Sequence, residues 1–146
     1  MNVSRIQREG GFTLIEIMVV VVILAVLATL VVPRVMDRPA QARIVKAKQD
    51  IRTIEGALDL YKLDNFVHPT TDQGLEALVK KPENDPEPPN WNASGYLPRV
   101  PQDPWSREYL YLNPGQHGAM DIYTLGADGI EGGEGNNADI GNWNLE

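Results

Sequence analysis

The feature that most constrains this chain is an almost uncharged stretch at residues 12–32, which reads FTLIEIMVVVVILAVLATLVV. At about 1.5 Å per residue, a helix of this length spans a hydrocarbon core of roughly 30 Å. A secretory signal peptide has a shorter apolar core followed by a small-residue cleavage site, whereas Pro33 and Arg34 follow this stretch directly. We therefore predict a transmembrane helix at residues 12–32 that is not cut on its C-terminal side.

Glu16 is the one charged residue of this stretch. A carboxylate in apolar surroundings is costly and persists where it has a partner or a role. One alternative is a side chain that reaches to the membrane interface. The other alternative is an ion pair. Cleavage between Gly11 and Phe12 would create a new α-amine one helical turn from Glu16, and the two charges could neutralise each other within or between subunits.

Composition limits the remaining possibilities. The chain has 146 residues, no cysteine, 13 basic and 20 acidic side chains and a net charge of −7, which fits one modest domain without disulfides or cysteine-bound zinc. Nine of the 13 basic residues lie within residues 1–63, whereas residues 121–146 hold six acids and no Lys or Arg. Because an acidic surface repels phosphates, we expect no nucleic-acid partner.

Helical periodicity continues beyond the apolar stretch. Pro33 is expected to end or kink the first helical segment. After Pro39, apolar residues recur at intervals of three and four, namely Ile44, Ala47, Ile51, Ile54, Leu58 and Tyr61. A coiled-coil seam is the alternative, but the pattern covers barely three heptads without a clean charge pattern. We predict an amphipathic stem that packs against the protein's own sheet.

The rest of the chain predicts a small domain. Thr70 and Gln73 form a capping-box pattern before a short helix that ends near Lys80 and Lys81. Seven prolines in residues 82–104 exclude regular structure there, and the expected anchors of this segment are Trp91, Tyr96, Leu97, Val100 and Trp105. Residues 108–112 and 120–125 predict two strands joined by a hairpin. The predicted fold class is α+β, a long N-terminal helix with a transmembrane half and a stem packed on a small antiparallel sheet.

Residues 126–142, GADGIEGGEGNNADIGN, combine six glycines with acidic and amide side chains. One interpretation is a solvated acidic tail. Against it, Ile140 and Trp143 are typical of a segment that docks, and glycines between oxygen donors let carbonyls turn toward a hard cation. The stretch is no EF-hand, because Ile130 and Gly132 occupy positions that would need ligands. A calcium site here would be built differently.

The junction Gly11-Phe12-Thr13-Leu14-Ile15-Glu16, after a leader with Arg5 and Arg8, resembles the processing site of type IV pilin-like proteins. In that family a prepilin peptidase cuts after the glycine and methylates the new N-terminal phenylalanine, and the glutamate guides subunit addition to a filament. The resemblance implies a leader at residues 1–11, cleavage between Gly11 and Phe12, methylation of Phe12 and an assembly role for Glu16.

The stretch at residues 125–143, LGADGIEGGEGNNADIGNW, is similar to the calcium loop of the major pseudopilins of type II secretion systems, as are PWSREYLYL and LDNFVHPTTDQGLEALVKKP. The resemblance implies bound calcium. The implied ligands are the Leu125 carbonyl, the Asp128 carboxylate, a carbonyl near Gly133, an oxygen of Asn136 and the Asp139 carboxylate. Related loops tend to have aspartates near Gly135, Asn136 and Asn137, so weaker binding is expected here.

The resemblance also implies a function. The chain would be a structural subunit, not an enzyme, that polymerises into a periplasmic pseudopilus and helps drive export of folded proteins across the outer membrane. It would be a single-pass protein of the bacterial inner membrane, with residues 33–146 as stem and periplasmic domain. Implied partners are further copies of the chain, minor pseudopilins, the prepilin peptidase and an inner-membrane assembly platform with its ATPase. Counting Lys and Arg slightly favours the opposite orientation, and we follow the resemblance.

Two alternatives remain. An adhesive or motility pilin commonly closes its C-terminal region with a cysteine pair, and this chain has no cysteine. A membrane-anchored periplasmic enzyme or binding protein would need a convergent set of catalytic or ligand groups. His68 and His117 have no such set around them in the sequence. We therefore expect neither histidine to bind a metal or to act as an acid or base.

Overall fold

The computed structural model describes residues 11–146, and the side chains of all of these except residues 30–37. Along the chain follow helix α1 (Leu14–Asn65), the 3₁₀ turn η1 (Leu75–Leu78), strands β1 (Leu110–Leu112) and β2 (Asp121–Thr124), the 3₁₀ turn η2 (Gly135–Asn137) and strand β3 (Ile140–Gly141). The chain divides into two compact units, one ending at Pro39 and one from Ala40 to Glu146, and α1 contributes to both. The implied leader, apart from Gly11, lies outside the described residues.

Helix α1 continues through Pro33, so of the two outcomes expected at this proline, an end or a kink, the end is wrong. A proline inside a helix removes one backbone hydrogen bond at a cost of about 3 kcal/mol, and the helix-forming sequence on both sides carries the helix across it.

The described residues bear on the transmembrane helix predicted at residues 12–32. None of their helices combines the length and the apolar character that a membrane crossing requires. Residues 30–32 of the span predicted at 12–32 belong to the part whose side chains are not described.

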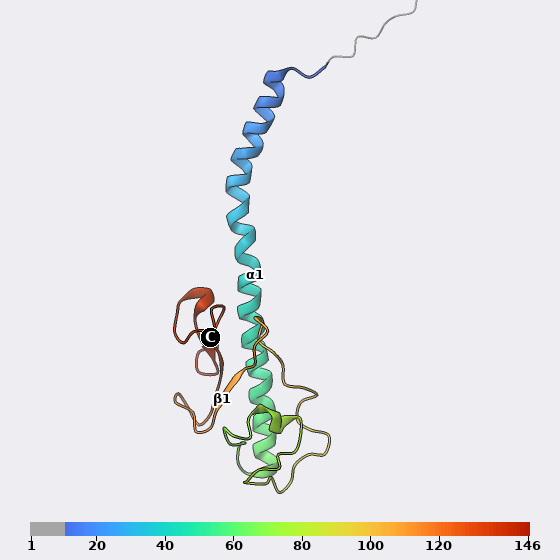
Figure 1. Cartoon of the computed structure of the whole chain (residues 1–146), viewed down its shortest axis with the longest axis vertical. Helices are drawn as coiled ribbons and strands as arrows, with labels where there is room; N and C mark the ends of the chain where they lie inside the picture. Colours follow the sequence, from blue (N-terminus) through green and yellow to red (C-terminus); the bar gives the residue numbers. More distant parts are fainter. Residues whose placement is uncertain (1–10) are drawn as a thin grey trace, which may run out of the picture. The chain divides into compact units, whose positions relative to one another are not determined.

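The core of the second unit forms on one face of α1. Ala47, Ile51, Ile54 and Leu58 are fully or almost fully buried, as the periodicity predicted. They pack with apolar side chains from η1, from the sheet and from the residues just before β1 and β2, namely Leu75, Leu78, Tyr109, Tyr111, Met120, Ile122 and Ile140. In Figure 1, β1 and the orange and red C-terminal segments lie along this part of α1. The protein's own sheet covers the stem, so the coiled-coil alternative is wrong.

The segment after α1 is less helical than predicted. Thr70 and Gln73 do form the capping box, with the Thr70 N–H donating to Gln73 Oε1 at 3.0 Å and the Gln73 N–H to Thr70 Oγ1 at 3.2 Å. Gly74 then adopts a φ of +61°, outside the helical region, and only the single turn η1 follows. Residues 82–104 contain no helix and pair only at Gln102, while the five predicted anchors pack against the core.

The sheet has three antiparallel strands in the order β1-β2-β3. The two predicted strands are present but shorter than expected. The third strand, β3, pairs Ile140 with Thr124 and Gly141 with Tyr123. This pairing brings the C-terminal segment back to the sheet and closes residues 125–139 into a loop between β2 and β3.

Candidate functional site

The processing junction precedes helix α1. Residues 11–13 are not helical, and the Phe12 side chain is 80% exposed. A Cβ added to Gly11 would meet no other atom within 4 Å. The Gly11-Phe12 peptide bond therefore lies outside the helix, next to an exposed Phe12 side chain.

Glu16 takes part in a capping box at the start of α1. The Thr13 N–H donates to Glu16 Oε2 at 3.4 Å, and the Glu16 N–H donates to Thr13 Oγ1 at 3.3 Å. These contacts satisfy amide groups that the first helical turn leaves free. This capping role was not among the sequence predictions, although a threonine three residues before a glutamate is its usual signal. The capping box holds the Glu16 carboxylate next to Thr13, the residue that follows Phe12.

The C-terminal loop is folded, so the interpretation as a solvated tail is wrong. Its two legs meet where the Ala127 N–H donates to the Asn136 carbonyl at 2.8 Å. A Cβ on Gly126 or on Gly133 would collide with the Asn137 carbonyl. Beyond the loop, Ile140 is buried in β3, and the Trp143 ring stacks on His117 at 3.7 Å between ring centroids. Both expected docking residues are confirmed.

Besides the Asn136 carbonyl, which accepts from the Ala127 N–H, three of the implied calcium ligands have defined contacts. The Leu125 carbonyl accepts from the Gly129 N–H at 3.2 Å, and Asp128 Oδ1 accepts from the Ile130 N–H at 3.1 Å. Asp139 Oδ2 accepts from the Gly132 N–H at 2.9 Å. Its second oxygen, Oδ1, is buried and has no hydrogen-bond partner. A buried carboxylate oxygen without a donor is unfavourable, so this oxygen can accept a hydrogen bond or coordinate a cation.

The surroundings of Asp139 are negatively charged. A cavity of about 200 Å³ is lined in part by Asp121, Glu131 and Asp139, together with Tyr123 and Leu125. Burial raises the pKa of the Tyr123 hydroxyl, and the charges of Glu131, Asp121 and Asp139 raise it further. The sequence did not predict that Glu131 lines this cavity beside Asp139, because its position in the chain does not show which way the loop folds.

The oxygen donors fit calcium better than a transition metal. Within residues 11–146 as described, no group of three His, Asp or Glu side chains is arranged to hold a metal ion. A site here would need backbone carbonyls and the Asn136 side chain besides Asp128 and Asp139. Calcium accepts such mixed sets of six to eight oxygens in flexible geometry, whereas zinc prefers nitrogen and sulfur ligands.

The two histidines have structural partners. His117 Nδ1 lies 2.9 Å from Asp121 Oδ2. Burial pushes the pKa of the Asp121 carboxyl up, but hydrogen bonds from His117 and Gln116 outweigh this and lower it. His68 Nε2 lies 3.6 Å from Asp59 Oδ1. His117 thus has a hydrogen-bond partner, whereas His68 Nε2 is buried and makes no hydrogen bond.

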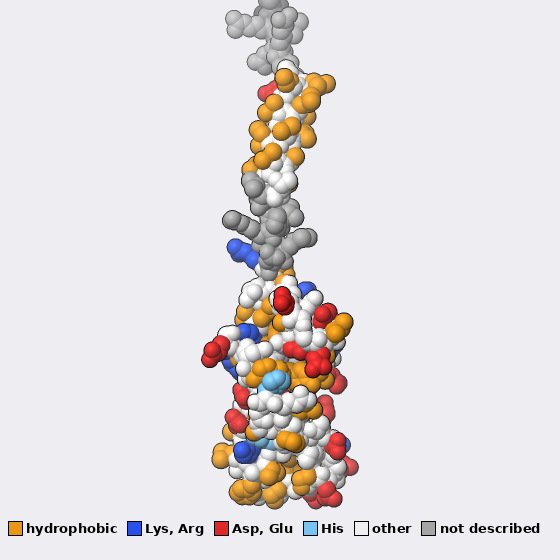
Figure 2. Space-filling view, turned by 90° about the vertical axis from the view of Figure 1, so that its left-hand side faces the viewer, with side chains coloured by type: hydrophobic (Ala, Val, Ile, Leu, Met, Phe, Trp, Pro, Cys, Tyr) orange, Lys and Arg blue, Asp and Glu red, His pale blue; other side chains and the backbone are white. Residues whose placement is uncertain are grey.

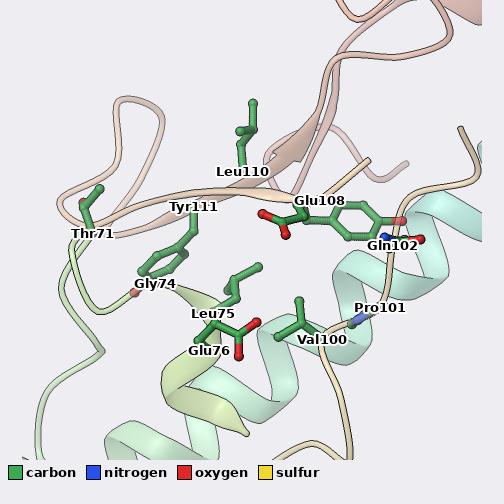
Figure 3. A pocket seen from close by; sticks show the side chains of 11 residues that line it. Thr71, Gly74, Leu75, Glu76, Val100, Pro101, Gln102, Glu108, Leu110 and Tyr111 are labelled. Atoms are coloured by element: carbon green, nitrogen blue, oxygen red, sulfur yellow. The ribbon is translucent and has the colours of Figure 1, made fainter. Parts of the chain in front are cut away.

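A larger cavity of about 310 Å³ lies between η1, residues 100–102 and β1 (Figure 3). Leu75, Val100 and Tyr111 make much of its lining apolar, and Glu76 and Glu108 are its only carboxylates. The lining contains no histidine, lysine or cysteine.

The arrangement agrees with comparisons to known proteins. A family model described as "Type II secretion system (T2SS), protein G" matches residues 34–143, and one described as "Prokaryotic N-terminal methylation motif" matches residues 6–32. The chain belongs to the type II secretion system protein G family. Similar members are the "Type II secretion system core protein G" of Pseudomonas aeruginosa, 64% identical over 94% of this chain and 96% of the relative, and that of Vibrio cholerae, 57% identical over 98% and 97%.

The solved structures include a member of the same family. The crystal structure of the major pseudopilin from the type 2 secretion system of enterohaemorrhagic Escherichia coli matches with a TM-score of 0.69 and 47% identity. The match covers 76% of this chain and 91% of that one. The resemblance to major pseudopilins, the pseudopilin fold and the expectation of a structural subunit in place of an enzyme are confirmed. Both alternatives, a motility pilin and a membrane-anchored binding protein, are set aside.

Proposed function

We propose that this protein G family member polymerises through its N-terminal helix into a periplasmic pseudopilus and helps drive folded proteins across the outer membrane. The observation that carries the proposal is the exposed apolar surface of α1 directly behind an open Gly11-Phe12 junction. Phe12, Leu14 and Ile15 are 70–80% exposed in the single chain. Such a surface needs a partner outside the chain.

Before assembly this surface lies in the bacterial inner membrane, with the second unit in the periplasm. After assembly it packs against the same surface of neighbouring copies. The prepilin peptidase would release residues 1–11, and assembly would involve minor pseudopilins and the inner-membrane platform with its ATPase. Mass spectrometry of membrane-extracted protein should find N-methylated Phe12 at the start of the mature chain. Finding residues 1–11 still attached in secreting cells would refute processing.

Glu16 would neutralise the α-amine of Phe12 in a neighbouring subunit. The capping box allows a sharp test. Glu16→Gln keeps a side chain that can close the box but removes the charge, whereas Thr13→Ala weakens the box and keeps the charge. We expect Glu16→Gln to abolish pseudopili seen by electron microscopy on overproduction with the other secretion components, and Thr13→Ala to retain them. The reverse result would assign Glu16 to helix capping alone.

Calcium would complete the loop at residues 125–139 by binding the lone Asp139 oxygen, the Asp128 carboxylate, an Asn136 oxygen and the carbonyls of Leu125 and Gly133. A ligand that binds only the folded state stabilises it by about 2.7 kcal/mol at a hundredfold excess over Kd, which raises the melting temperature by several degrees. Chelator should remove this shift, calcium should restore it better than magnesium, and Asp139→Asn should lack it. Identical melting curves with chelator and with millimolar calcium would reject the site.

A further inference from the structure

Arg107 lies outside the C-terminal loop in sequence but contacts it in the fold. Its Nη2 donates a hydrogen bond to the Gly126 carbonyl and lies 3.3 Å from Asp103 Oδ2. Gly126 follows Leu125, one of the proposed ligands. The guanidinium thus links the first leg of the loop, residues 125–129, to the segment that precedes β1.

Asp103 gives Arg107 a rigid support. Its side chain is almost fully buried. Asp103 Oδ1 accepts from the N–H groups of Trp105 at 2.9 Å and Arg107 at 2.8 Å, and Oδ2 accepts from Thr124 Oγ1 at 2.6 Å. Thr124 is the last residue of β2. One carboxylate therefore holds the arginine and the strand end from which the loop begins.

Gly129 makes room for the guanidinium. A Cβ at this position would collide with Arg107 Nη1, and the residue has a φ of +69°. The Gly129 N–H also closes the first leg by donating to the Leu125 carbonyl. Residues 125–129 therefore contact the guanidinium at two points, at the Gly126 carbonyl and at Gly129.

We propose that Arg107 is a positioning residue that latches residues 125–129 to the domain and so arranges the Leu125 carbonyl and the Asp128 carboxylate for the cation. This inference rests on the proposed calcium function. An isolated positive charge near a cation site would weaken binding. Here Asp103 balances the charge, so the ordering of the leg outweighs the repulsion. Removing the arginine should then weaken calcium binding.

The first test is calcium titration of the full chain in detergent by calorimetry. Arg107→Ala should bind calcium about tenfold more weakly, the effect typical of groups that orient metal ligands. Arg107→Lys should recover part of the affinity, because an ammonium can donate to the Gly126 carbonyl but cannot contact Gly126 and Asp103 with the fixed geometry of a guanidinium. The control is Arg99→Ala, which removes the same charge from an exposed position. Unchanged or tighter binding by Arg107→Ala would overturn the proposal.

A matched pair of glycine substitutions distinguishes the loss of the Arg107 contact from the effect of backbone strain. Gly129→Ala displaces the guanidinium at a φ of +69°, whereas Gly135→Ala meets nothing within 4 Å at a φ of +60°. Both substitutions carry similar strain, so a larger loss of calcium affinity in Gly129→Ala measures the arginine contact. Equal losses would contradict the latch.

Hydrogen exchange in chelator tests the latch without calcium. The Gly129 amide should be protected in the wild-type chain and should exchange faster in Arg107→Ala, with the core amides unchanged. Equal exchange of Gly129 in both proteins would refute the latch. If the wild-type chain bound no calcium at all, the proposed calcium site would fail, while this measurement would still decide whether Arg107 orders residues 125–129.

Discussion

The N-terminal and C-terminal parts of α1 are both rich in apolar residues, but they use them differently. Between residues 14 and 27 the apolar side chains are about half exposed or more on every side, from Val20 at 48% to Leu14 at 79%. Between residues 47 and 61 the apolar side chains on one face are at most 4% exposed. Figure 2 shows the same contrast on one face of the molecule, with orange side chains covering the described N-terminal part and a mixed surface on the second unit.

The difference shows where each part obtains its stabilisation. A periodic pattern such as Ile51, Ile54 and Leu58 can be covered by one sheet of the same chain, and burying each side chain contributes roughly 1.5–3 kcal/mol. A helix that is apolar on all sides cannot be covered by one sheet. Its partners must surround it, as lipid or as copies of the same helix do. The second unit is therefore expected to fold by itself, and the N-terminal part to depend on its environment.

The largest expected effect tests this division directly. Ile54→Ala should lower the free energy of unfolding of the second unit by about 2–5 kcal/mol, because it opens a cavity in a fully buried position. Val22→Ala removes apolar volume from the exposed part and should leave that free energy unchanged. Urea unfolding of the full chain in detergent, followed by tryptophan fluorescence, measures both. Equal destabilisation by the two substitutions would break the comparison.

A smaller effect is expected where polar contacts close the second unit. Asn142 Oδ1 accepts from the Ile122 N–H, and Asn142 Nδ2 donates to the Met120 carbonyl, both at 3.1 Å. Asn142→Ala should lower the free energy of unfolding by about 1–3 kcal/mol, since both partners lose a bond. Asn142→Asp keeps the acceptor and should cost less. If the two variants unfolded alike, the acceptor contact would contribute nothing.

The end of α1 offers a stabilising change. Phe66 follows the helix with a φ of +69°, its N–H donates to the Lys62 carbonyl at 2.7 Å, and its ring is 74% exposed. Glycine adopts this left-handed geometry without the strain that other residues carry. Phe66→Gly should raise the free energy of unfolding by about 1 kcal/mol. Calorimetry that showed a lower melting temperature would mean that the ring contributes more than its exposure indicates.

The smallest expected effect depends on pH. Burial and the charge of Lys62 lower the pKa of His68, and Asp59 only partly opposes them. The unfolded chain therefore takes up a proton before the folded chain does as the pH falls. Stability from this group is present above a pH of about 6.5 and is lost as the pH falls from there toward the lowered pKa of the folded state. Melting temperatures in this range should fall less steeply for His68→Gln than for the wild-type chain.

The sequence predicted the features that repeat or lie close together. The apolar periodicity of the stem and the capping box of Thr70 with Gln73 depend on intervals of three or four residues, and both are present. The short helix predicted after Gln73 is present only as the single 3₁₀ turn η1, because the backbone of Gly74 leaves the helical region. Strand β3 has only two residues, too few to show alternation.

The candidate site was less predictable than the fold. The oxygen donors Asp128 and Asp139 were named from sequence, but their contacts depend on backbone amides of Ile130 and Gly132, which any residue type except proline could supply. The arginine at the loop comes from a segment 18 residues before Leu125. Such a contact arises only when the sheet brings distant segments together, so no local pattern could reveal it.

The pairing of Ile140 with Thr124 makes the loop a replaceable module. Strands β2 and β3 hold the two ends of the loop as neighbours in the sheet. The pairing of the strands therefore offsets the entropic cost of closing the loop, and the residues inside the loop need not contribute to it. Substitutions between these ends can change which ion the loop prefers while the stem and core keep their packing. If the loop binds an ion as proposed, exchanging residues 125–139 between related chains that share this scaffold should transfer the ion preference with the loop.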